Sequence, residues 1–205
     1  MDSKMNNLSA VVITKNESHN IEECIASLQS VSDDIIVVDC GSTDNTVALA
    51  ESLGARVFQR EWTGYSDQKN FGNEHAIHDY VLSLDADERL SIEVAKRINQ
   101  EFENPSHKAY ALPFLTAWKG KLIKHGAWGN DWHVCLFYKK EIEWVGRGIH
   151  EGLDTKGLPI KRLHGFVYHY TADKNIDYRN KMTRYAQEFA AANKVKNKRF
   201  PFWKK

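Results

Sequence analysis

Two aspartates that directly follow an apolar run are the residues of this chain with the clearest chemical potential. Residues 82–84 (Leu-Ser-Leu) lead into Asp85, Ala86 and Asp87. At the end of a buried parallel strand, an Asp-x-Asp pair offers hard oxygen ligands for a divalent cation that carries phosphates. The same pattern alone is also typical of a polar turn before a helix. Its chemistry therefore depends on what else reaches that edge of the sheet.

Two more polar turns follow predicted strands, TKNE at residues 14–17 and DCGSTDNT at residues 39–46. Backbone N–H groups, hydroxyls and a carboxylate at the carboxyl edge of a sheet can bind a base and a ribose. Lys69, early in a predicted helix, is placed to face a diphosphate. Taken singly, a helix cap for Gly-Ser-Thr-Asp and a solvated lysine are the commoner uses of such residues.

The elements that must position these residues follow from the pattern of apolar runs. From residue 8 to residue 101, short β-branched runs alternate with helical patterns, which predicts βαβ units and a mainly parallel sheet. Asn20 and Glu23 have the spacing of a capping box, and Gly54 is placed as a helix stop. The expected strands are residues 9–14, 34–39, 56–59 and 80–84, and the expected helices are residues 20–28, 46–53, 66–76 and about 91–102.

After Asn104 and Pro105 the pattern changes to strand-like segments rich in aromatic residues. We expect a second half, on the same sheet or beside it, that shapes a substrate pocket. The strand-like segments are residues 110–115, 134–138, 142–145 and 166–170.

Composition narrows the class of protein. With 205 residues, 42% of them hydrophobic, the chain can bury the core of one domain with an appendage or of two small domains. A formal net charge of +1 argues against nucleic-acid binding. Cys24, Cys40 and Cys135 lack Cys-x-x-Cys spacing, which favours a reducing cytosol. A polar amino terminus and the lack of a long apolar run predict a cytoplasmic protein that is not secreted and crosses no membrane.

Four motifs together resemble family 2 glycosyltransferases with the GT-A fold: TKNE, VVDCGSTDNT, KNFG and LDAD, in that order and spacing. The resemblance is strong over residues 8–90. Within the family, Asn16-Glu17 and the later Ile-His-Glu at residues 149–151 are similar to the bacterial branch that includes lipopolysaccharide-core β-glucosyltransferases. The resemblance to the family implies an α/β, Rossmann-like sheet. Residues 1–105 would bind a sugar nucleotide, and residues 106–175 would form the acceptor side of the same domain. Residues 176–205 would follow as an amphipathic helix and a tail.

The resemblance also implies roles for individual residues. Asp87 would bind Mg²⁺ or Mn²⁺. Much of the family has a second aspartate where this chain has Cys40, so either Asp39 takes over the base contact or the nucleotide preference differs. The residues implied to bind the UDP-sugar are Thr14, Asn16, Glu17, Asp39, Lys69, Asp85 and Ala86.

The expected mechanism follows from charge. Departure of the nucleoside diphosphate leaves negative charge that a metal ion stabilises, and the acceptor hydroxyl needs a base on the opposite face. Glu151 is the expected base, and a surface glutamate after a turn is the alternative. Four roles stay open for His150: it could orient Glu151, contact a phosphate, bind the metal or make a structural hydrogen bond. His164 and His169 are interpreted as structural, and sugar stacking or core packing is open for Trp128, Trp132 and Trp144.

Residues 176–194 have helical amphipathic spacing, and residues 194–205 combine basic and aromatic side chains. They predict either peripheral contact with the inner membrane surface or a solvated tail. The chain stops soon after Trp203, and an element beyond it is left open.

The sequence thus predicts an inverting, metal-dependent transferase that moves a hexose, glucose as the narrower choice, from a UDP-sugar to a glycan or glycolipid acceptor. The narrower acceptor is a lipopolysaccharide-core heptose. A nucleotidyltransferase is the first alternative, although TKNE lacks the glycine of a phosphate loop. A non-catalytic sugar-nucleotide-binding or membrane scaffold protein is the second.

Overall fold

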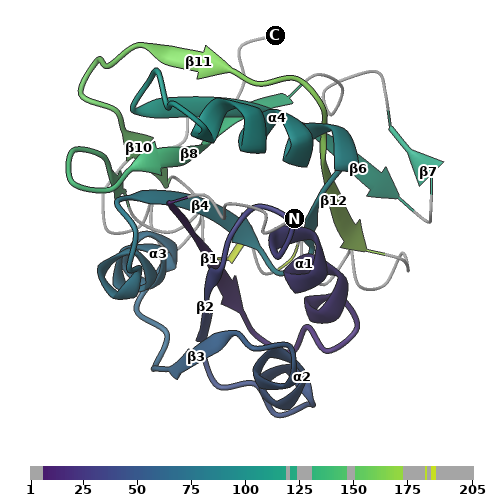
Figure 1. Cartoon of the computed structure of the whole chain (residues 1–205). Coiled ribbons are helices and arrows are strands. Elements are labelled where there is room, and N and C mark those ends of the chain that lie inside the picture. The colour runs from purple at the N-terminus through teal and green to yellow at the C-terminus, as the bar shows by residue number, and fades with distance from the viewer. Residues whose placement is uncertain are drawn as a thin grey trace, which may run out of the picture.

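The computed structural model describes residues 7–118, 121–123, 131–146, 151–172, 183 and 186–187. Among these residues a mixed sheet of ten strands forms the centre, with the strand order β3-β2-β1-β4-β8-β6-β12-β5 and with β11 and β7 also paired to β6 (Figure 1). The strands of this sheet are β1 (Leu8–Thr14), β2 (Asp34–Asp39), β3 (Arg56–Gln59), β4 (Tyr80–Asp85), β5 (Glu88–Leu90), β6 (Ala109–Trp118), β7 (Lys121–Leu122), β8 (Asp131–Tyr138), β11 (Ile160–Arg162) and β12 (Val167–Ala172).

The first four strands are parallel, and each is joined to the next by a helix. The predicted strands in this half are confirmed, and β2 and β3 have the bounds that the sequence indicated. Because the strands run in one direction, the polar turns after β1, β2 and β4 meet at one edge. The helices are α1 (Ile21–Leu28), α2 (Thr46–Ser52), α3 (Tyr65–His75) and α4 (Ile92–Phe102).

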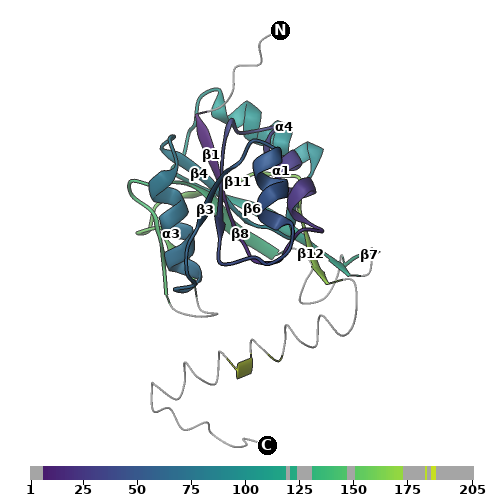
Figure 2. The ribbon, with the colours of Figure 1, turned by 90° about the horizontal axis from the view of Figure 1, so that it is seen from below.

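Helices cover both faces of the sheet, with α3 on one face and α1 on the other (Figure 2). The alternation of side chains along β1 shows why. Leu8 and Val12 belong to the core that contains residues of α1, α2 and α4, whereas Val11 and Ile13 belong to the second core, against which α3 residues pack. A strand that is buried on both faces therefore has a continuous run of apolar residues in its sequence.

Helix α3 lies unusually close to the sheet at Gly72. A Cβ atom added there would lie 2.3 Å from Val11 Cγ1 and 3.1 Å from Val38 Cγ2. Only a glycine fits at such a distance. Because of this close approach, polar side chains of α3 lie against the second core.

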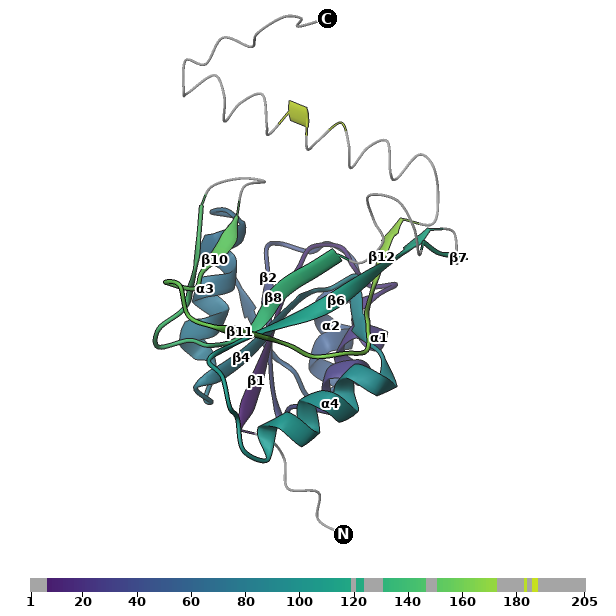
Figure 3. The same ribbon diagram turned by 90° about the horizontal axis from the view of Figure 1, so that it is seen from above.

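The second half continues the same sheet. Strand β8 is antiparallel to β4 and to β6, and β12 is parallel to β6. A separate antiparallel pair, β9 (Glu143–Val145) and β10 (Gly152–Asp154), lies beside α3 (Figure 3). The aromatic-rich strands were therefore correctly expected, whereas the short strands β5, β7, β10 and β11 were not.

One local prediction is wrong. In the described structure Asn20 makes no side-chain capping bond. Its amide nitrogen donates to Glu17 Oε2, its oxygen accepts from Arg89, and Glu23 pairs with Arg89 instead. The capping box fails because Arg89, distant in sequence, supplies a stronger charged partner. The helix stop at Gly54 is confirmed by its φ of +83°.

Within the described residues Cys24, Cys40 and Cys135 form no disulfide bond. Of the predicted helix over residues 176–194, only Thr183, Ala186 and Gln187 are described, and the tail over residues 194–205 lies outside the described residues. Among the helices that the structure describes, none has the length and apolar character needed to span a bilayer.

Candidate active site

The turns after β1 and β2 are joined into one polar rim. The N–H of Asn16 donates to Ser42 Oγ at 2.8 Å, and Asn16 Oδ1 accepts from the N–H of Thr43 at 2.8 Å. The N–H of Glu17 donates to Thr46 Oγ1 at 2.9 Å. Asn16 has a φ of +56°, a conformation that asparagine tolerates better than most residues. The motifs TKNE and DCGSTDNT thus form a single surface.

Asp39 is buried beneath this rim, 1% exposed. Its carboxylate accepts from the N–H groups of Gly41 and Ser42, both at 3.0 Å, and so shapes its own turn. Thr14 Oγ1, also buried, has no hydrogen-bond partner among the described residues. An orphaned hydroxyl at this edge is the kind of group that a bound ligand satisfies.

Asp85 ends β4, Ala86 is buried in the following turn, and Asp87 precedes β5. Glu88, the first residue of β5, accepts from the N–H of Asp85 at 2.9 Å. Burial first, and then the charge of Asp85, raise the pKa of Glu88 to about 8. The turn therefore crowds three carboxylates, an arrangement that a cation stabilises.

A histidine from the second half completes this acidic cluster. Strand β12 runs antiparallel to β5 and sets His169 opposite Glu88. His169 Nε2 lies 3.3 Å from Asp87 Oδ2, and one ligand atom from each of Asp87, Glu88 and His169 lies within 4.8 Å of the other two. Two carboxylates and an imidazole are a suitable donor set for a divalent metal.

Sequence reasoning missed Glu88 as a site residue and read His169 as structural. The pairing that joins them depends on β5, a strand of three residues. Nothing in the spacing of the chain signals that so short a segment pairs with β12. The position of Glu88 directly after the Asp-x-Asp was the one available clue.

Lys69 projects from α3 between two carboxylates. Its Nζ lies 2.8 Å from Glu151 Oε1 and 3.3 Å from Asp85 Oδ1, and 4.3 Å from the centre of the Trp144 ring. The side chain is 7% exposed. Burial lowers the pKa of Lys69, but the charges of Asp85 and Glu151 outweigh it and raise that pKa well above its ordinary value.

Glu151 lies just before β10 with a side chain 20% exposed. Burial raises the pKa of its carboxyl, and the charge of Lys69 offsets part of that rise. Its second oxygen, Oε2, is buried and has no hydrogen-bond partner among the described residues. One oxygen of Glu151 is therefore held by Lys69, and the other keeps its lone pairs free of hydrogen bonds within the described residues.

The remaining candidates divide between the described and undescribed parts of the chain. His150 and Trp128 lie outside the described residues. The rings of Trp132 and His164 lie edge to face with their centres 6.0 Å apart, and the guanidinium of Arg162 lies 4.9 Å from the centre of the Trp132 ring. Trp144 packs against Phe137 and Lys69, so it forms a wall beside the charged residues rather than an open stacking face.

An α/β sheet of this order, with an acidic turn after β4, has the architecture of the GT-A class of enzymes. The model of the family described as "Glycosyl transferase family 2" matches residues 9–155. The chain belongs to this family and is a glycosyltransferase.

Known proteins that resemble the chain agree with this assignment. An uncharacterized glycosyltransferase of Rickettsia typhi is 31% identical over 219 residues, which cover 96% of this chain and 71% of that protein. The lipopolysaccharide core biosynthesis glycosyltransferase LpsC of Rhizobium meliloti is 40% identical over 88 residues, covering 40% of this chain and 32% of LpsC.

Among solved structures, S. aureus TarS 1-349 superposes with a TM-score of 0.57 at 17% identity, over 88% of this chain and 64% of TarS 1-349. The chain thus spans less than two thirds of that structure. At this identity the likeness shows the fold, and the GT-A fold predicted from the four motifs is confirmed.

Proposed function

We propose that the chain transfers a hexose, glucose as the narrower choice, from a UDP-sugar to a hydroxyl of a lipopolysaccharide-core or other cell-surface glycan, with inversion. The observation that carries the proposal is the meeting of the polar rim, the acidic turn and Glu151 at one edge of the sheet. The similarity to LpsC supports the acceptor class, and TarS, which shares the fold, binds UDP-GlcNAc and UDP.

The donor would be held by both halves of the polar rim. Thr14 Oγ1 lacks a partner among the described residues and is suited to the nucleoside, while Asn16, Glu17 and Asp39 fix the loops around it. Asp85 and Ala86 would line the sugar-diphosphate side of the turn. Because Asp39 is occupied by its own turn, its direct base contact stays a prediction.

Mg²⁺ or Mn²⁺ would be held by Asp87, with Glu88 and His169 completing the set. Mg²⁺ takes oxygen ligands almost exclusively, so the imidazole of His169 favours Mn²⁺. When bound, the metal supplies Lewis-acid stabilisation of the departing diphosphate. The residues fit such an ion, because one ligand atom from each of Asp87, Glu88 and His169 lies within 4.8 Å of the other two.

Glu151 would accept the proton of the acceptor hydroxyl through Oε2 while Lys69 holds Oε1. A general base must lie within hydrogen-bond reach of its proton and keep a lone pair free for it. Oε2 meets the second condition within the described part of the chain. His150 would act beside it in one of the roles left open by the sequence.

The test is a donor screen. Purified protein with MnCl₂ is given UDP-glucose, UDP-galactose, UDP-GlcNAc and GDP-mannose, with truncated lipopolysaccharide as acceptor, and nucleotide release and glycan mass are measured. The proposal expects UDP release that depends on the acceptor and adds one hexose to it. In a parallel assay with UTP and glucose 1-phosphate, release of pyrophosphate would point to the nucleotidyltransferase alternative, and binding without turnover in either assay would point to a scaffold.

A cytoplasmic location with peripheral membrane contact belongs to the same proposal, since a lipid-linked acceptor is presented at the inner leaflet. Sedimentation with vesicles containing anionic lipids tests the contact. We expect removal of residues 194–205 to weaken it and to leave the release of UDP from a soluble acceptor unchanged.

A further inference from the structure

The side-chain amide of Asn70 makes two hydrogen bonds with the backbone of β9, like those that a neighbouring strand would make. Asn70 Nδ2 donates to the carbonyl oxygen of Trp144 at 2.8 Å, and the N–H of Trp144 donates to Asn70 Oδ1 at 3.0 Å. The two bonds satisfy both polar groups of one backbone residue, as a paired strand would. Ser66, one turn earlier on α3, donates to the carbonyl oxygen of Val145 at 3.1 Å. Helix α3 therefore holds the outer edge of β9 by side-chain bonds.

The segment held in this way carries the proposed base. In the antiparallel pair, Gly152 lies opposite Val145 and Leu153 opposite Trp144. Glu151 directly precedes Gly152, so a shift of β9 moves the backbone from which its carboxylate projects. Lys69, the neighbour of Asn70 in sequence, binds that carboxylate itself. Adjacent residues of α3 thus bind the backbone of β9 and the side chain of Glu151.

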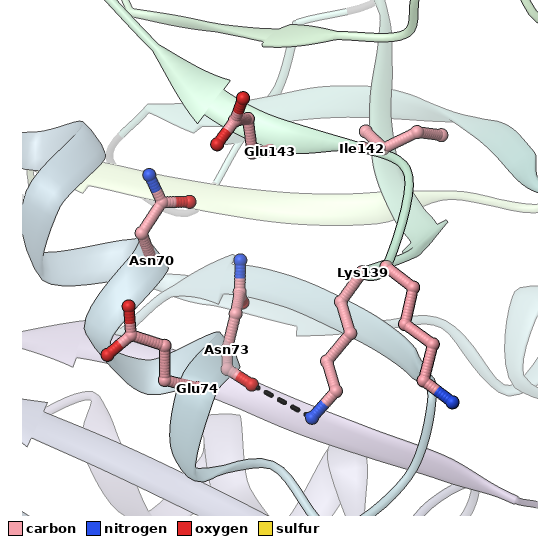
Figure 4. Close-up of a pocket in the computed structure, with 7 residues that line it drawn as sticks. Asn70, Asn73, Glu74, Lys139, Ile142 and Glu143 are labelled. Carbon is pink, nitrogen blue, oxygen red and sulfur yellow. Dashed lines mark hydrogen bonds between the residues drawn. The ribbon is translucent and has the colours of Figure 1, made fainter.

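Two cavities border the Asn70 side chain where it joins α3 to β9. A cavity of about 320 Å³ lies between α3 and the segment leading into β9, lined by Asn70, Asn73 and Glu143 among others (Figure 4). A second, of about 570 Å³, lies toward the start of α3 and is also lined by Asn70, with Ser66 and Gly146. The hydrogen bonds of Asn70 therefore join α3 to β9 between two hollows, at a place where side-chain packing is incomplete.

From this geometry we propose that Asn70 is a positioning residue for Glu151 in the transfer reaction, acting through β9 and β10. The inference rests on the proposed function, in which Glu151 is the base. Asn70 touches neither the acidic turn nor the polar rim in any contact of the described residues, so its effect falls on the geometry of the base and not on donor binding. Displacement of a reacting group by about 1 Å can lower a rate by about 100-fold.

The test compares Asn70→Ala with Asn73→Ala. Asn73 is a buried asparagine of the same helix whose Oδ1 has no hydrogen-bond partner among the described residues, so its removal leaves β9 held. We expect Asn70→Ala to lower kcat for the donor identified above by about 10- to 100-fold, with the Kd for UDP and MnCl₂ unchanged within about twofold. Asn73→Ala should keep the wild-type kcat.

Hydrogen exchange provides a second measurement that does not depend on activity. Peptides covering residues 143–146 and 151–154 should exchange faster in Asn70→Ala than in the wild type or Asn73→Ala. The milder variant Ser66→Ala, which removes one bond from the same edge, should shift kcat and exchange in the same direction by less. It keeps the test decisive if Asn70→Ala is poorly folded.

Unchanged kcat in a folded Asn70→Ala variant, unchanged exchange in β9 and β10, or parallel loss of UDP binding would each overturn the role of Asn70. These outcomes differ from a failure of the proposed function, which would appear as no UDP release by the wild type with any donor and acceptor. That result would remove the base role of Glu151 and the positioning role with it.

Discussion

Lys69 Nζ and Glu151 Oε1 lie 2.8 Å apart although 82 positions separate the two residues in the chain. The same ammonium lies 3.3 Å from Asp85 Oδ1. One buried cation therefore pairs with a carboxylate at the end of β4 and with a carboxylate of the second half. It ties the donor side of the proposed site to the acceptor side.

Replacing this cation should change the pH dependence of turnover. Lys69→Met removes the charge that lowers the pKa of Glu151, so that pKa should rise. A base works only when deprotonated, and activity is lost as pH falls through its pKa. We expect the acidic limb of the kcat profile, measured by UDP release, to move to higher pH. Lys69→Arg, which keeps the charge, should show a smaller shift, and identical profiles for Met and wild type would contradict the pairing.

The same substitution should destabilise the fold near neutral pH. Removing Lys69 leaves Asp85 Oδ1 and Glu151 Oε1 without their cation. Breaking a fully buried pair costs about 3–5 kcal/mol, and we expect a smaller loss here because solvent reaches the Asp85 side chain, which is 41% exposed. Urea unfolding of Lys69→Met would measure it. A double variant with Glu151→Gln should recover part of the loss, and an equal loss in both would show that Glu151 is not the partner that matters.

Glu151→Gln should abolish transfer while keeping donor affinity. The amide has nearly the same shape but cannot accept the proton of a hydroxyl, and loss of a general base lowers kcat by about 10²- to 10⁴-fold. Calorimetry with UDP and MnCl₂ gives the affinity, and UDP release gives kcat. Turnover equal to wild type would remove Glu151 from the mechanism.

Asp87→Asn and His169→Ala should each weaken Mn²⁺ binding by more than about tenfold, because each removes one ligand of a proposed three-ligand set. Titration of Mn²⁺ by electron paramagnetic resonance in the presence of UDP measures this without turnover. Glu93→Gln, which removes an exposed carboxylate of α4, is the control and should bind as wild type. Full Mn²⁺ affinity in His169→Ala would exclude the histidine from the site.

Gly72→Ala should destabilise the protein by about 1–3 kcal/mol, since its Cβ would overlap Val11 and push α3 off the sheet. Thermal unfolding measures the change. Gly152→Ala is the matched control, because a Cβ there meets nothing within 4 Å, and we expect it to alter stability by less than about 0.5 kcal/mol. Equal effects in the two variants would show that α3 can yield at Gly72.

Asp34 should link stability to acid pH. Burial raises its pKa, but hydrogen bonds from Ser9, the N–H of Ile77 and Arg56 outweigh this and hold the pKa below its ordinary value. The stabilisation is therefore present above the unfolded-state pKa and is lost as pH falls through the lower folded-state pKa. Asp34→Asn should cost about 1.5–3 kcal/mol at pH 7 and much less at pH 2, as urea unfolding at the two pH values would show. A constant difference at both pH values would be inconsistent with this link.

The sequence by itself determined the parallel half of the fold and its chemistry-bearing edge. Apolar runs buried on both faces predict strands with little ambiguity, and β2 and β3 have the predicted bounds. Motifs that follow such strands must meet at the carboxyl edge, because parallel strands all end there. Local spacing was enough for the four parallel strands and for the helix stop at Gly54, but not for the cap at Asn20 or for β5.

Only the tertiary structure decided which distant side chains meet. The partner of Glu88 is His169, through a strand of three residues, and the partner of Lys69 is Glu151 rather than open solvent. Asn20 lost its expected capping role to a contact with Arg89, and Asn70 gained a backbone partner in Trp144. Such pairings depend on the order of the strands in the sheet and on the close approach of α3 at Gly72. The local sequence pattern predicts neither of these.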